Sequence, residues 1–251
     1  MPMTRQKILI TGASSGLGAG MARVFAAKGR DLALCARRTD RLDELRAELL
    51  ERHPGITVAV AALDVTDHEQ VPKVFAELSD ELGGLDRIIV NAGIGKGARL
   101  GSGKLWANKA TIETNLVAAL VQIETAIEMF KSAGGGHLVL ISSVLAHKGV
   151  PGVRAAYAAS KAGLSSLGES LRAEYAKGPI KVTVIEPGYI DSEMTARAET
   201  TTLLVDNQTG TKAMVAAMER EPGRAAVPSW PWTPLVQVLR LLPPQVAAKF
   251  A

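Results

Sequence analysis

The sequence predicts a doubly wound α/β fold, in which helices cover both faces of a parallel β-sheet. Short apolar runs alternate with helical stretches along most of the chain, an order that is typical of repeated strand–helix–strand units. The runs are continuously apolar, as expected for strands that are covered on both faces. With 251 residues, of which 47% are hydrophobic and 22% charged, the chain has the composition of a globular protein. We expect a single domain that spans residues 1–251.

The predicted elements follow from these patterns in chain order. Apolar runs predict strands at residues 7–11, 32–36, 57–63, 87–90, 137–142 and 181–186. Helical patterns lie between them at residues 17–28, 39–52, 67–82, 111–132 and 156–177. Thr39 and Thr66 occupy expected helix N-caps, and Gly29, Gly83 and Gly178 follow expected helix ends.

The pattern changes after Pro187. Residues 188–222 contain no clear strand and predict a loop with one or two short helices, which we expect to cover a substrate site. Residues 224–228 predict a last strand, and the apolar tail at 229–251 predicts a helix that prolines interrupt at positions 243 and 244. We favour a tail that packs over the substrate site or over a subunit interface. The alternative is a tail that rests on a membrane surface.

Composition and charge restrict the kinds of partner. The net charge is +4 with dispersed basic residues, and aromatic residues make up only 4%, so nucleic-acid binding is disfavoured. Cys35, the one cysteine, lies in an apolar run, so we expect it to be buried in a strand rather than to be a reactive thiol. No two of the four histidines have metal-ligand spacing, so we expect no metal site; they are His53, His68, His137 and His147.

The expected location is the cytoplasm. Only residues 1–7 precede or begin the first apolar run, which leaves no room for a signal peptide. No stretch approaches the length of a membrane span.

A glycine-rich segment follows the first predicted strand. Gly12, Gly16 and Gly18 form the pattern G-x-x-x-G-x-G directly before a helical stretch. Glycine weakens both strands and helices, so three glycines in seven residues require a reason. Bare backbone beside a helix N-terminus can approach and bind an anion, which predicts the pyrophosphate of a dinucleotide in a Rossmann-like fold. A tight turn without a ligand is the alternative, although one glycine would suffice for a turn.

This segment resembles the cofactor motif of the short-chain dehydrogenase/reductase family. TGASSGLG at 11–18 is followed, in the family's order, by NAG at 91–93, ISS at 141–143, YAASK at 157–161 and EPGYIDSEM at 186–194. The resemblance extends from about residue 7 to residue 194. It implies a compact Rossmann-like domain that binds a nicotinamide cofactor and interconverts a carbonyl compound and an alcohol.

The expected chemistry centres on Tyr157 and Lys161, which share one face of a predicted helix because four residues separate them. A neighbouring ammonium and an oxidised nicotinamide ring would lower the pKa of the phenol, so that Tyr157 acts as general acid in reduction and as general base in oxidation. The resemblance implies that Lys161 also binds the nicotinamide ribose, that Ser143 orients the substrate oxygen and that Asn115 completes a proton relay. Ser143 precedes Tyr157 by fourteen residues, one more than is usual in the family, so Ser142 stays an alternative.

The end of the second predicted strand bears on the choice between NAD and NADP. An acid at this position would bind the adenosine ribose, but Ala36 stands there and Arg37 follows. A guanidinium suits a 2′-phosphate, so we expect NADP(H), with Arg38 either assisting or solvated. Asp64 and Val65 match the family's adenine contact. The remaining cofactor-binding residues implied by the resemblance are Gly12, Ser14, Ser15, Gly16, Leu17, Gly18, Asn91, Ala92, Gly93, Tyr157, Lys161, Pro187, Gly188, Ile190 and Ser192.

These expectations describe an NADPH-dependent oxidoreductase acting on a small carbonyl compound or alcohol. A Rossmann-fold nucleotide sensor or scaffold without catalysis is the alternative, and the complete Ser–Tyr–Lys set argues against it.

His147 and Arg154 either contact the substrate or belong to a solvated loop. The resemblance further implies a homodimer or homotetramer formed through the helices that carry Asn115 and Tyr157. A weak indication of an apolar substrate comes from Leu145, Val150, Val153, Met194, Leu203 and Leu204.

Overall fold

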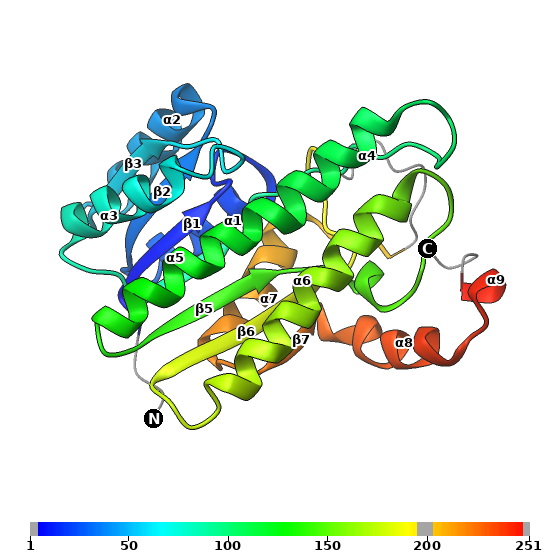
Figure 1. Cartoon of the computed structure of the whole chain (residues 1–251). Coiled ribbons are helices and arrows are strands. Elements are labelled where there is room, and N and C mark those ends of the chain that lie inside the picture. The colour runs from blue at the N-terminus through cyan, green and yellow to red at the C-terminus, as the bar shows by residue number, and fades with distance from the viewer. Residues whose placement is uncertain (1–4, 195–202, 248–251) are drawn as a thin grey trace.

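A parallel sheet of seven strands forms the centre of the computed structural model, which describes residues 5–194 and 203–247 (Figure 1). The strand order is β3-β2-β1-β4-β5-β6-β7, and every neighbouring pair is parallel. The strands are β1 (Lys7–Thr11), β2 (Asp31–Ala36), β3 (Val58–Ala62), β4 (Arg87–Val90), β5 (Gly136–Ile141), β6 (Ile180–Pro187) and β7 (Arg224–Val227). The order reverses between β1 and β4, and open α/β sheets form their ligand-binding crevice at the carboxyl ends of the strands at such a point. The predicted doubly wound fold is confirmed.

Helices cover both faces of the sheet, and Figure 1 shows α5 and α6 crossing one face while α7 lies behind the other. The first apolar core packs between the sheet and the helices α1 (Gly16–Ala26), α2 (Thr39–Arg52) and α7 (Asn207–Glu219). The second core packs against α3 (Gln70–Leu82), α5 (Ala118–Ser132) and α6 (Ala155–Glu174). Alternate residues of each buried strand supply the two cores: Ile8 and Ile10 belong to the first and Leu9 to the second.

Several predicted boundaries differ from the structure. The helix expected at 111–132 begins earlier, as α4 (Leu105–Ile112), and continues through a π-helical turn at Glu113–Val117 into α5. Thr66 is not a helix N-cap, because its backbone N–H and hydroxyl both bond to the Asp64 carboxylate in a turn before α3. Thr39 is the first residue of α2, one position after the cap. Gly83 ends α3 in the left-handed conformation, as predicted.

The region after β6 is more regular than the sequence indicates. A bridge between Ile190 and Val205 precedes α7, a helix of thirteen residues. The predicted last strand is confirmed as β7, and two helices follow it: α8 (Ser229–Leu241) and α9 (Pro244–Ala247).

The first helix of the tail packs against the body of the protein. Trp232 and Val236 of α8 are buried against Val144, next to the end of β5. A Cβ built on Gly188 would lie 2.0 Å from Trp232 Nε1, so the indole fills the space directly against the end of β6. This packing favours the first alternative for the described part of the tail. Within the described residues, no helix is long and apolar enough to cross a membrane.

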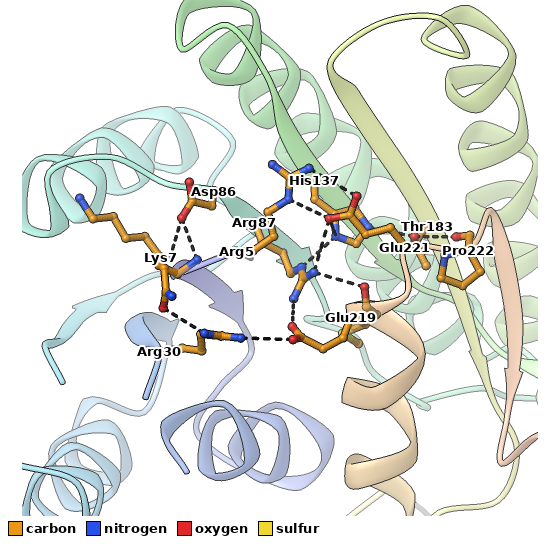
Figure 2. Close-up of polar contacts among 12 residues, drawn as sticks. Arg5, Lys7, Arg30, Asp86, Arg87, His137, Thr183, Glu219, Glu221 and Pro222 are labelled. Atoms are coloured by element: carbon orange, nitrogen blue, oxygen red, sulfur yellow. Dashed lines mark hydrogen bonds and ion pairs between the residues drawn. The ribbon is translucent and has the colours of Figure 1, made fainter. Parts of the chain in front are cut away.

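A cluster of buried and partly buried charges lies at the amino ends of β4 and β5 (Figure 2). Arg87 of β4 is 1% exposed; its Nε donates to His137 Nδ1 at 2.8 Å and its Nη1 binds Glu219 Oε1 at 2.7 Å. Arg5 binds Glu221 at 2.7 Å in the same cluster. Burial and the nearby cations Arg87 and Arg5 hold the pKa of His137 well below its usual value, so this imidazole is neutral. The cluster connects the first residues of the described chain to the end of α7.

Candidate active site

The glycine-rich loop lies at the crevice, between β1 and α1. Gly12 and Gly16 have φ angles of 67° and 53°, in the left-handed region that favours glycine. A Cβ on Gly18 would lie 2.4 Å from Gly12 O, and one on Gly12 would lie 2.9 Å from Ala92 Cα. The loop is therefore closely packed, and α1 begins within it at Gly16, where helix N–H groups are free to bind an anion.

The loop is held by the segment after β4. Thr11 Oγ1 accepts hydrogen bonds from the backbone N–H groups of Asn91 and Ala92, at 3.0 and 3.1 Å. The Asn91 side chain donates to Thr11 O at 2.8 Å. In this structure Asn91 joins the ends of β1 and β4, which fixes the position of the glycine loop. Thr11 is a residue that the sequence analysis did not single out for this task.

The two candidate serines at the end of β5 have different surroundings. Ser142 Oγ donates to Lys161 O at 2.9 Å and bonds to Ser165 Oγ at 2.7 Å, within the protein interior. Ser143 Oγ accepts a hydrogen bond from Leu145 N at 3.2 Å, and the Ser143 side chain lies close enough to Tyr157 to lower the pKa of the phenol. Ser143 is thus the serine that the structure brings to the phenol.

Tyr157 and Lys161 lie side by side on α6. Lys161 Nζ lies 5.9 Å from the centroid of the Tyr157 ring and donates to Ile141 O at 2.8 Å. Burial lowers the pKa of Lys161 to about 8. Burial also raises the pKa of Tyr157; the Ser143 hydrogen bond opposes this shift, and the phenol of Tyr189 adds to it. The chain's own groups therefore do not produce the lowered phenol pKa that the sequence analysis expects.

Asn115 lies in the π-helical turn between α4 and α5. Its amide bonds to both backbone groups of Ile94: Oδ1 accepts from Ile94 N at 2.8 Å and Nδ2 donates to Ile94 O at 2.9 Å. A Cβ built on Gly93 would lie 3.2 Å from Asn115 Oδ1 and 3.5 Å from Lys161 Nζ. The structure thus brings Asn115, Gly93 and Lys161 together.

The two arginines after β2 have separate partners. Arg38 donates to Ser15 Oγ at 2.6 Å and to Ser14 Oγ at 3.3 Å, so its guanidinium lies against the glycine loop. Arg37 is largely exposed and pairs with Asp64 at 3.8 Å. Burial works to raise the pKa of Asp64, but hydrogen bonds from Thr66 and the charge of Arg37 lower it overall. Arg38, rather than Arg37, is the arginine that the fold places at the loop.

Most of the remaining predicted cofactor-binding residues follow β3 and β6, and one lies in α1. Val65 is buried beside Asp64. Gly188 packs on Trp232, and Ile190 forms the bridge to Val205. A Cβ on Gly16 would lie 3.4 Å from Ser192 Cβ, so the segment after β6 lies next to the glycine loop. Leu17 is a partly buried residue of the first turn of α1.

His147 and Arg154, which lie between Ser143 and Tyr157 in the sequence, both form side-chain hydrogen bonds within the protein. His147 Nε2 and Glu186 Oε2 are 2.7 Å apart and both side chains are buried, while Arg240 of α8 donates to His147 Nδ1 at 3.0 Å. His147 therefore connects the tail to β6. Arg154 donates to the Tyr189 hydroxyl at 3.2 Å. The described residues hold no group of three His, Cys, Asp or Glu side chains that suits a metal ion.

A family model described as short chain dehydrogenase matches residues 6–203. The chain belongs to the short-chain dehydrogenase family. An uncharacterized oxidoreductase of Mycobacterium tuberculosis is 78% identical over 99% of this chain and 98% of its own length. Dehydrogenase/reductase SDR family member 7B of Bos taurus is 35% identical over 77% of this chain and 60% of its own. The protein is therefore an oxidoreductase of this family.

Solved structures agree with this assignment. The NADPH-dependent 3-quinuclidinone reductase of Rhodotorula rubra superposes with a TM-score of 0.79 at 27% identity, covering 87% of this chain and 88% of that chain. A short-chain type dehydrogenase/reductase of Mycobacterium marinum gives a TM-score of 0.80 at 26% identity, covering 89% and 94%.

Proposed function

We propose that this short-chain dehydrogenase is an NADP(H)-dependent enzyme that interconverts a carbonyl compound and an alcohol, with Tyr157 as the general acid and base. The observation that carries the proposal is the arrangement around the Tyr157 phenol, which lies close enough to the Ser143 side chain for it to lower the pKa of Tyr157 and which lies beside the Lys161 ammonium. Tyr157 and Lys161 share one face of α6, and Ser143 follows the end of β5, directly before a short 3-10 turn, so a helix and a strand end hold the positions of these groups.

The pKa directions agree with Tyr157 as the proton donor when the reaction runs as a reduction. Because burial raises the pKa of Tyr157, the phenol is protonated at neutral pH and ready to donate to a carbonyl oxygen. Ser143, which lies next to the phenol, would donate a hydrogen bond to the same oxygen. Lys161, with a pKa of about 8, is mostly an ammonium at neutral pH and stabilises the phenolate that remains after donation. Bound NADPH would supply the hydride to the carbonyl carbon.

The surroundings of Arg38 support NADP(H) over NAD(H). No acid stands at the end of β2, where Ala36 is buried, so a 2′-phosphate meets no carboxylate from that position. The Arg38 guanidinium and the hydroxyls of Ser14 and Ser15 are hydrogen-bonding groups that suit a phosphate. The named NADPH dependence of the Rhodotorula reductase, a relative at 27% identity, agrees with this choice.

Substitution of Tyr157 by phenylalanine tests the mechanism. We expect kcat/KM for NADPH oxidation, followed by absorbance with a panel of carbonyl compounds, to fall about 10²- to 10⁴-fold. NADPH binding, followed by fluorescence, should persist. The matched control is Tyr175→Phe, at the far end of α6, which should keep full activity. Equal turnover by Tyr157→Phe and the wild type would overturn the acid–base role, and NADPH binding without turnover on any carbonyl would favour the sensor or scaffold.

We also infer a homodimer or homotetramer that forms through α4, α5 and α6. Leu105 and Trp106 of α4 are 75% and 67% exposed, and Val117 and Leu120 near the start of α5 are also exposed. Apolar side chains in such a group are typical of an interface. Light scattering of the wild type and of Trp106→Glu tests this inference; a monomeric wild type would contradict it. We propose further that the substrate is a small molecule, that residues 188–222 cover it and that the protein is located in the cytoplasm.

A further inference from the structure

A carboxylate from the segment after β6 lies between two arginines near the glycine loop. Glu193 Oε2 is 3.2 Å from Arg38 Nη1, and Glu193 Oε1 accepts a hydrogen bond from Arg41 Nη1. The two arginines belong to the start of α2, more than 150 residues earlier in the chain. Arg38 also reaches the Ser14 and Ser15 hydroxyls, so one guanidinium joins the glycine loop to Glu193.

Glu193 is an ionised group in this position. Hydrogen bonds from Arg41 and Arg38, together with the charges of these two arginines, lower the pKa of its carboxyl below the usual value and outweigh the opposing effect of burial. The same contact raises the pKa of Arg41, to which the nearby acids Asp40 and Glu44 add smaller effects. A full negative charge therefore lies between two full positive charges.

Guanidinium groups bind carboxylates and phosphates through the same donor geometry. A phosphate monoester offers three terminal oxygens and nearly two negative charges at neutral pH, against one charge on a carboxylate. The proposed 2′-phosphate binding site contains Arg38, and Glu193 already occupies one edge of that guanidinium. Phosphate and carboxylate would compete for the same donors.

We propose that Arg41 belongs with Arg38, Ser14 and Ser15 to the 2′-phosphate subsite, and that Glu193 is an internal anion which the 2′-phosphate displaces. This inference rests on the proposed use of NADP(H). Glu193 then weakens NADPH binding selectively, since NADH carries no phosphate at this position and leaves the ion pairs intact. Displacement of Glu193 also releases the segment after β6 from α2, which links the occupancy of the phosphate subsite to the segment that follows Gly188.

Glu193→Gln tests the inference through binding alone. Dissociation constants for NADPH and NADH are measured by fluorescence titration at low ionic strength. Partly exposed ion pairs contribute up to about 1 kcal/mol, so the NADPH constant should fall about two- to fivefold while the NADH constant stays nearly unchanged. The matched control is Glu44→Gln, which removes an exposed acid of α2 that has a charge effect on Arg41 but no hydrogen bond to it. Its effect should be smaller.

Arg41→Gln provides the second arm. We expect it to raise the NADPH constant and to spare the NADH constant, and the further change Glu193→Gln should then have a smaller effect than in the wild type because one of the two competing contacts is gone. Unchanged or weaker NADPH binding by Glu193→Gln would overturn the inference. The wild type decides the proposed function separately: binding NADH as tightly as NADPH would overturn the cofactor choice, whatever the variants show.

Discussion

Replacing Lys161 with methionine measures how much the buried ammonium lowers the free energy of unfolding. Lys161 is 5% exposed, and burial lowers its pKa from 10.5 to about 8. This difference corresponds to about 3 kcal/mol against the folded state at neutral pH, where the lysine is charged in both states. Methionine preserves the apolar stem without the charge.

The sign of the pH dependence follows from proton binding. The folded chain releases the Lys161 proton near pH 8, whereas the unfolded chain holds it until about pH 10.5. The unfolded state binds more protons across this window, so the wild type gains stability relative to Lys161→Met as the pH rises. Integrating the linkage relation between pH 7 and pH 9.5 gives a gain of about 2 kcal/mol.

Urea unfolding of both proteins at several pH values between 7 and 9.5 checks this gain. The variant also loses the bond from Lys161 Nζ to Ile141 O, which is worth about 1.5 to 3 kcal/mol, so the change with pH carries the prediction rather than the difference at one pH. Lys181→Met, at an exposed position of β6, is the control and should show no such slope. A difference between wild type and Lys161→Met that stays constant across the range would refute the reasoning.

Two further predictions concern stability. Arg87→Ala removes a fully buried side chain and its bonds to His137 and Glu219, although Glu219 keeps its ion pair with Arg30. We expect urea unfolding to show a loss of about 3 to 5 kcal/mol, against less than about 1 kcal/mol for Arg23→Ala, whose ion pair is exposed. Equal losses would show that the cluster is not buried as described. Gly18→Ala places a Cβ 2.4 Å from Gly12 O, so we expect a loss of about 1 to 3 kcal/mol together with weakened NADPH binding. Gly55→Ala has open space around its Cβ and should be nearly neutral; if both variants unfold alike, the loop is looser than its geometry indicates.

Local patterns were enough to predict the sheet. Buried parallel strands are continuously apolar, so each run identified a strand, and the glycine loop identified the turn after β1. The start of α4 was missed because its first residues, Leu105 and Trp106, are exposed and give no apolar stripe that faces a core. The π-helical turn at Asn115 was missed for a related reason, since one additional residue in a turn leaves little trace in the apolar pattern.

The site was predictable only where its residues lie close together in the sequence. Tyr157 and Lys161 are one helical turn apart, and the pairing of Ser143 with Tyr157 follows from a short segment. The contact of Glu193 with Arg38 spans 155 residues, and spacing along a single chain says nothing of such a pair. The effect of burial on the Tyr157 pKa could not be read from the sequence, because burial depends on all the elements packed around the phenol.

The charge cluster at the amino ends of the strands has a consequence for synthesis on the ribosome. Arg5 and Arg87 receive their carboxylates from Glu221 and Glu219, and the bond between Arg5 and Glu221 joins positions 216 residues apart. If β1 through β6 packed together before α7 was made, Arg5 and Arg87 would be buried without their counter-charges. For the same reason, a fragment that contains β1 through β6 but ends before α7 should not fold on its own, and we expect it to aggregate or to be degraded.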